Sequence, residues 1–85
     1  MRIIMYIEEI TQTSFLCPSE WKGRLADGMS VYVRYRFGDL RMGYGPTPDE
    51  AIVNSFVVWQ SKDRLAGGMK TESMLRLTGL IGSSG

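Results

Sequence analysis

The residues of this chain whose types and spacing point most clearly to chemistry are basic side chains on predicted strands. Between positions 31 and 37, apolar residues alternate with Tyr32, Arg34 and Arg36, and a period of two with this contrast is typical of a half-buried strand. The polar side chains then share the face that lies away from the core. With the neighbouring strands in place, this face is predicted to gather five of the ten basic residues: Lys22, Arg24, Arg34, Arg36 and Arg41.

A predicted hairpin positions the last of these arginines. Gly38-Asp39 fits a two-residue turn with glycine first, as a type II′ turn requires. In this register Arg36 lies opposite Arg41, and the apolar faces of the two strands match. Arg34 lies opposite Gly43, which leaves an open space beside its side chain.

Phosphate binding is the chemistry that this arrangement predicts. Like charges directly opposite each other destabilise a sheet. The net charge of the chain is only +1, so an excess of basic residues does not explain why five of them share one face. Guanidinium groups bind phosphate oxygens in a fork geometry, and an aromatic side chain on the same face offers a base a surface to stack on. The predicted ligand is therefore an anion such as a nucleotide or nucleic acid, and the predicted ligand-binding residues are Arg34, Arg36, Arg41, Tyr32, Arg24 and Lys22.

A simpler interpretation of the same face stays open. The solvated face of an antiparallel sheet is usually polar, and arginine stems cover neighbouring apolar surface. Glu20 and Asp39 are expected only at the margins of the basic face. Glu8 and Glu9 would neutralise some of the arginines if the first strand pairs beside them.

The upstream hairpin has two possible registers. A two-residue Asp27-Gly28 loop would turn charged residues toward the core. A three-residue loop that starts at Ala26, with Gly28 in the left-handed region, instead places Trp21 on the apolar face opposite Val33. We predict the second register because it buries the tryptophan and leaves the charges in water.

A helix start is the clearest local signal. Thr47-Pro48-Asp49-Glu50 offers an N-cap threonine, a proline at the first helical position and acids in the first turn. The helix is predicted to run from Pro48 to about residue 66 and to stop at Gly67-Gly68. Its main apolar stripe would be Ile52, Phe56 and Trp59.

The two ends of the chain give weaker patterns. Residues 1–15 are rich in β-branched and aromatic types and are expected to form a strand. Residues 71–81 fit either a strand or a short helix; we expect the helix, capped by Thr71 and ended by Gly79. The predicted fold is α+β: a three- to four-stranded antiparallel sheet packed on one long helix, with a short C-terminal helix. Residues 1–81 would form a single βββα-type domain and 82–85 a flexible tail.

Composition narrows the function. A chain of 85 residues has a thin core, and apolar residues beyond the main helix stripe suggest cover by a second subunit, so a homo-oligomer is expected. The chain has no histidine and one cysteine, so imidazole catalysis and an intrachain disulfide are excluded, and a catalytic role for Cys17 is not expected. We expect no enzyme activity, metal or cofactor. No apolar run is long enough to span a membrane, and a cytoplasmic location is expected.

One stretch carries a family resemblance. The run from Gln12 to Gly23, which contains Cys17-Pro18-Ser19, is followed by Asp27-Gly28 and by the strand from Val31 to Gly38. This pattern resembles a group of small uncharacterised proteins from phages and actinobacteria. These share a Cys-Pro-Ser-x-Trp-x-Gly stretch before a Tyr-x-Arg-Tyr-Arg strand. The resemblance covers about a third of the chain. It implies a phage or mobile-element setting, with the host cell cytoplasm as location, and no particular activity.

A second resemblance is architectural. Three strands with arginines on one face, followed by Thr-Pro-Asp-Glu-Ala at a helix start, are similar to plant ethylene-response-factor DNA-binding domains and to the arm-binding domains of phage integrases. This likeness implies that Arg34, Arg36 and Arg41 contact bases and phosphates of duplex DNA. The net charge of +1 departs from the basic excess usual in DNA-binding domains.

The sequence therefore predicts one function and leaves two alternatives open. The leading prediction is a small binding protein of phage type that holds a phosphate-bearing ligand, a nucleotide signal or nucleic acid, and so inhibits a host defence system. The first alternative is a sheet-face DNA-binding module. The second is an inhibitor that contacts a partner such as a host defence protein through the apolar side of the helix and its tail, without a small ligand.

Overall fold

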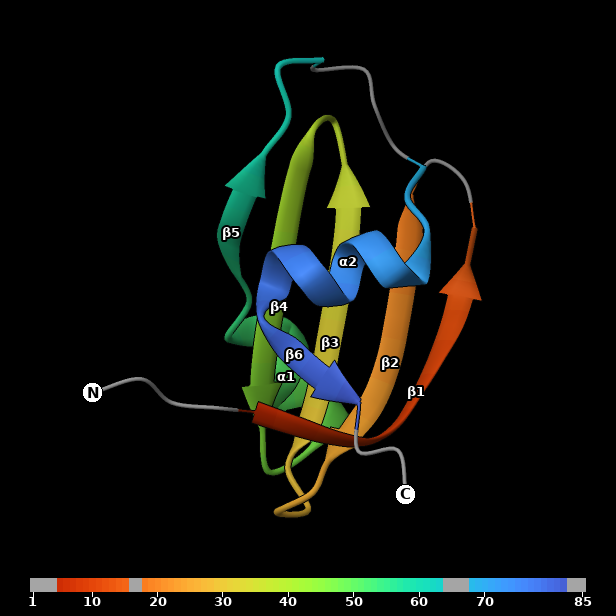
Figure 1. The fold of residues 1–85 in the computed structure, drawn as a ribbon. Helices are drawn as coiled ribbons and strands as arrows, with labels where there is room; N and C mark the ends of the chain where they lie inside the picture. Colours follow the sequence, from red (N-terminus) through yellow and green to blue (C-terminus); the bar gives the residue numbers. More distant parts are fainter. Residues whose placement is uncertain (1–4, 16–17, 64–67, 83–85) are drawn as a thin grey trace, which may run out of the picture.

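The computed structural model describes residues 5–15, 18–63 and 68–82 of the chain as one curved sheet with two short helices (Figure 1). The elements in chain order are β1 (Met5–Ser14), β2 (Ser19–Leu25), β3 (Ser30–Arg36), β4 (Asp39–Gly45), α1 (Pro48–Val53), β5 (Phe56–Gln60), α2 (Thr71–Thr78) and β6 (Leu80–Gly82). The six strands lie in the order β5-β4-β3-β2-β1-β6. All neighbours are antiparallel except β1 and β6, which are parallel. The prediction of three to four strands on one long helix is wrong.

The long predicted helix is replaced by a short helix and an edge strand. Thr47 caps α1 as predicted, because its hydroxyl accepts a hydrogen bond from the backbone N–H of Glu50 at 3.2 Å. The helix ends at Val53, however, and residues 56–60 pair with β4 as β5. This segment reads Phe-Val-Val-Trp-Gln, and β-branched and aromatic residues fit a sheet edge better than a helix. Of the rest of the predicted helix, residues 61–63 are described and form no helix, and residues 64–66 fall outside the described residues.

The sheet curls into a half-barrel because β1 bends. Its pairing with β2 shifts register twice, between Ile7 and Glu9 and between Gln12 and Ser14, and such bulges increase the local bend and twist of a strand. Residues 5–7 of β1 pair with β6 and residues 7–14 pair with β2, so that β1 curves around one end of the sheet (Figure 1). Gly23 on β2 permits this close approach, since a Cβ there would overlap the carbonyl oxygen of Glu9.

The core lies on the inner face, which we define as the face of the sheet that α2 crosses (Figure 1). Trp21 and Val33 are fully buried there, and Met74 of α2 is buried with them. The Trp21 indole N–H donates to the Thr71 hydroxyl at 2.9 Å, which ties α2 to the sheet. Gly79 ends α2 in the left-handed conformation, as predicted. Thr71 lies in the helix rather than at its N-cap, a position that Lys70 takes.

The two hairpins place the polar side chains on the opposite, outer face. The β2–β3 register is the predicted one, with Trp21 opposite Val33 and Gly28 at φ +90°. The β3–β4 turn lies one residue earlier than predicted: Phe37 and Gly38 have φ values of 53° and 77°, which fits a type I′ turn. Each β3 residue therefore pairs two positions earlier on β4, and this even shift leaves the predicted faces unchanged.

Two smaller predictions concern the ends and the membrane. Gly82 is the last residue of β6, and the other three residues of the predicted tail, 83–85, fall outside the described residues, as does Cys17. No helix in the described ranges is long and apolar enough to cross a bilayer.

Candidate functional site

The basic residues on the outer face are brought together by strand pairing. Arg34 of β3 lies directly opposite Arg41 of β4, and Arg36 lies opposite Asp39. Residues that face each other across an antiparallel pair project from the same side of the sheet. Together with Phe37, these side chains line a hollow of about 210 Å³, which we call the arginine hollow.

Arg41 is held by neutral groups. Its Nη2 donates to the carbonyl oxygen of Ser55 at 3.0 Å, and its Nε lies 3.5 Å from the Ser55 hydroxyl. Ser55 follows the C-cap of α1, where free carbonyl groups carry partial negative charge. These neutral contacts orient the guanidinium and do not neutralise its positive charge. Across the described part of the chain, Arg41 and Arg36 have no carboxylate within ion-pairing distance.

The positive charge of Arg34 is partly compensated by a nearby carboxylate. Glu20 lies opposite it on β2, so this acid sits inside the basic face and not at the margin where it was expected. The Arg34 Nε is 3.9 Å from a Glu20 carboxylate oxygen and makes no hydrogen bond to the described residues. Both side chains are about one-third exposed or less, and an ion pair at this length and exposure contributes little. Asp39, the second acid, lines the arginine hollow and accepts a hydrogen bond from Gln60 at 3.0 Å.

Tyr32 lies on the outer face but below its surface. The residue is only 7% exposed, and its hydroxyl donates to Glu20 at 3.1 Å. Burial raises the pKa of the Tyr32 phenol, and the hydrogen bond to the Glu20 carboxylate raises it further. A buried ring offers almost no surface for a base, so the exposed stacking surface expected of Tyr32 is not there.

The cover over Tyr32 is α1. Gly43 lies opposite Tyr32 and not, as predicted, opposite Arg34, and a Cβ at Gly43 would overlap the carbonyl oxygen of Ala51. The open space predicted at Gly43 is therefore filled by α1, and it is not beside Arg34. The helix covers the outer face near the start of β3 and the end of β4. The arginine hollow lies at the other end of the same two strands.

The remaining predicted site residues lie apart from the hollow. Arg24 is paired with Glu8 at 3.1 Å and with Glu9 at 3.7 Å, because β1 runs beside β2. Lys22 is exposed, between Thr11 and Tyr32 in the register. Of the six predicted residues, Arg34, Arg36 and Arg41 line the hollow, and Tyr32, Arg24 and Lys22 do not.

Phe37 is a site residue that the sequence prediction missed. It lines the arginine hollow, is 56% exposed and has the Arg36 guanidinium carbon 4.6 Å from its ring centroid. The prediction placed it among the alternating apolar residues of the strand, on the face away from the arginines. The signal that could have found it is Gly38 itself, because a type I′ turn accepts glycine second and so moves the preceding residue out of the strand.

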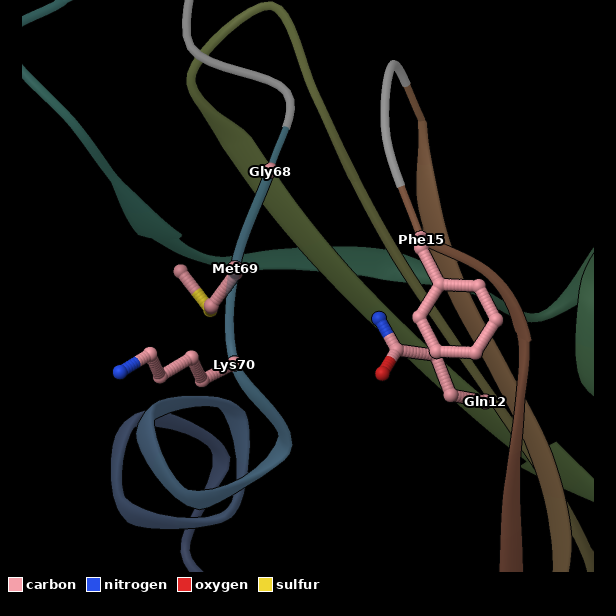
Figure 2. A pocket seen from close by; sticks show the side chains of 5 residues that line it. All are labelled: Gln12, Phe15, Gly68, Met69 and Lys70. Atoms are coloured by element: carbon pink, nitrogen blue, oxygen red, sulfur yellow. The ribbon is translucent and has the colours of Figure 1, made fainter.

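A second, larger cleft lies between the end of β1 and the segment before α2. It measures about 410 Å³ and is lined by Gln12, Phe15, Gly68, Met69 and Lys70. Figure 2 shows the side chains of Met69 and Lys70 extending away from Gln12 and Phe15. With one charged residue, directed outward, this cleft is poorer in groups for an anion than the arginine hollow.

Neither a metal-binding cluster nor a similar protein gives further information about the chemistry of this site. Within the described residues, no group of three or more histidine, cysteine, aspartate or glutamate side chains is placed to hold a metal ion. Comparison of the chain with protein-family models, with curated proteins and with solved structures found no match.

Proposed function

We propose that this protein binds a phosphate-bearing ligand, a nucleotide or the end of a nucleic acid strand, in the arginine hollow and performs no reaction on it. The observation that carries the proposal is the direct opposition of Arg34 and Arg41 beside Arg36 in one hollow. Opposed like charges cost stability. A bound phosphate would replace this repulsion with charge-assisted hydrogen bonds.

The size of the hollow supports a phosphate group over a whole small molecule. Sites that enclose a drug-sized ligand measure roughly 300–1,000 Å³, whereas the hollow measures about 210 Å³. The phosphate would therefore occupy the hollow, and the rest of the ligand would lie at its rim.

The wider role rests on the sequence resemblance. In a phage setting, capture of a nucleotide signal or nucleic acid would inhibit a host defence system in the host cytoplasm. This part of the proposal is supported by the Cys-Pro-Ser-x-Trp-x-Gly pattern and not by the site.

A discrete ligand is favoured over duplex DNA. Binding to a duplex depends on many phosphate contacts spread along the protein. Here α1 covers the outer face at Gly43, and the acids Glu20 and Asp39 interrupt the basic side chains. The sheet-face DNA-binding alternative would need an open and continuous basic surface.

A second copy of the chain is the protein partner that the surface supports best. β5 is an edge of the sheet, and its residues Phe56–Gln60 carry no charge. Ile52 and Val53 of α1 and Phe56 and Val57 of β5 are exposed apolar side chains. Natural edge strands are usually protected by charges or proline, and two neutral β5 strands can pair antiparallel without like charges meeting.

Light scattering should give twice the chain mass for the protein and a single chain mass for Val57→Lys. A monomeric protein would reject the second copy. Capture of another protein by the same edge would favour the inhibitor alternative.

Thermal unfolding with a panel of ligands tests the main proposal. Inorganic phosphate, mononucleotides, a short single strand and a duplex are compared at low and moderate salt. A ligand at a hundred times its Kd should stabilise the protein by about 2.7 kcal/mol. Arg41→Ala should reduce the shift. Arg76→Ala, which removes the same charge from the exposed side of α2, should leave it unchanged. Equal losses in both variants, or no stabilisation by any of these anions, would refute a site in the hollow.

A further inference from the structure

Phe37 has an unusual backbone conformation for its residue type. Its φ of 53° is the only positive value recorded for a non-glycine residue in the described chain. The left-handed region is unfavourable for residues with a Cβ and is an outlier for a bulky side chain. The first central position of a type I′ turn is usually asparagine, aspartate or glycine. Turn chemistry alone therefore disfavours phenylalanine at this position.

Burial does not explain Phe37 either. The residue is 56% exposed at the tip of the β3–β4 hairpin, so its ring gains little from the hydrophobic effect. Arg36 lies over the ring at 4.6 Å, a cation–π contact that is weak at an exposed site. Strained residues of this kind concentrate at ligand-binding sites, and Phe37 lines the arginine hollow.

We propose that Phe37 is the stacking platform for the base of the ligand. The ring has two faces; Arg36 occupies one, and the exposed surface leaves the other for a planar group. The phosphate would lie between Arg34 and Arg41 while the base stacks on Phe37 at the rim. This inference rests on the proposed function and narrows it: the ligand is a mononucleotide, or a strand end with an unstacked base, and neither inorganic phosphate nor an intact duplex.

Affinities for a matched pair of probes separate stacking from phosphate binding. Base–aromatic stacking strengthens binding by roughly 5- to 150-fold per base. Adenosine monophosphate should therefore bind at least fivefold more tightly than inorganic phosphate. Phe37→Asn should bring the two dissociation constants together, and Phe37→Trp should keep them apart. Arg41→Ala should weaken both probes and preserve their ratio.

The same variants test the backbone argument. Because asparagine suits the turn, Phe37→Asn should raise the midpoint of thermal unfolding while it lowers nucleotide affinity. A lower midpoint would overturn the inference. So would equal weakening of nucleotide and phosphate in Phe37→Asn, since the ring would then only position Arg36; that result would leave phosphate binding in the hollow intact. Absence of binding of both probes to the unaltered protein would refute the proposed function and this inference with it.

Discussion

The inner and outer faces of this sheet are made by the same strands, yet they differ in how they are covered. On the inner face, α2 and β6 complete a core in which Trp21, Val33 and Leu40 are fully buried. On the outer face, α1 covers only the part around Gly43 and leaves the arginine hollow open. The comparison shows that side-chain alternation decides which residues share a face, while the length of a covering helix decides which of them can meet a ligand.

The largest effect is expected for Trp21→Ala on the inner face. The change removes a fully buried indole and its hydrogen bond to Thr71, and truncation of a buried tryptophan costs about 3–5 kcal/mol. In a chain of 85 residues this is a large part of the total stability. Chemical denaturation should show it as a large drop in midpoint. A loss under about 1 kcal/mol would mean that the inner face is not the main core.

Gly43→Ala tests the covered part of the outer face. The new methyl group would overlap the Ala51 carbonyl oxygen, so α1 must move away, and overpacking of this kind costs about 1–3 kcal/mol. Tyr32 should become more exposed, which tyrosine fluorescence quenching can follow. The control is Gly45→Ala, where the nearest atoms leave more room. Equal stability of the two variants would argue against the close contact of α1 with β4.

Thr47→Ala should have a smaller effect on the same cover. Loss of the hydrogen bond from the Glu50 N–H should cost about 1 kcal/mol. Ligand affinity should not change, because the residue lies outside the arginine hollow. A loss of affinity without loss of stability would show that the start of α1 takes part in binding.

Arg41→Ala should barely change stability, in contrast to Trp21→Ala. Relief of repulsion from Arg34 opposes the loss of the bonds to Ser55, and surface substitutions of this kind stay within about 0.5 kcal/mol. Denaturation of the protein without ligand is the measurement. Unfolding of this variant would make the arginines structural and remove the contrast between the faces.

The smallest effect is expected at high pH. Because burial and Glu20 raise the pKa of Tyr32 in the folded protein, the folded state favours the neutral phenol. This contribution is complete below the ordinary tyrosine pKa of about 10 and is lost as pH rises through the higher folded value. Stability should therefore fall above pH 10, and less so in Tyr32→Phe. The same decline in both would place the titration elsewhere.

Much of the sheet was predictable because alternation and turns are local. The alternation from Val31 to Arg36 and the position of Gly28 determined the faces and the first hairpin. The second turn was one residue out, since Gly38 suits either central position. The pairing of residues 5–7 with 80–82 leaves no trace in local periodicity. The spacing of Ile52, Phe56 and Trp59 fits a helix, and only the free edge of β4 makes the last two part of a strand.

The candidate site was predictable to the same extent. Arg34, Arg36 and Arg41 come together because the predicted and the observed registers differ by an even number of residues, so alternation places the three on one face in both. Phe37 was missed because its role depends on which residues form the turn. Tyr32 was misjudged because its burial depends on α1 crossing Gly43, a tertiary contact that no local pattern reports.

The most direct test of the account is to follow the arginine side chains while a nucleotide is added. In a nuclear magnetic resonance titration with adenosine monophosphate, the Nε–Hε signals of Arg34, Arg36 and Arg41 should shift together with one dissociation constant, while those of Arg24 and Arg76 stay still. Arginine signals that do not move at all, or that move most at Arg24, would contradict a phosphate site in the arginine hollow. So would backbone signals that move most around Gln12 and Met69, the residues of the other cleft.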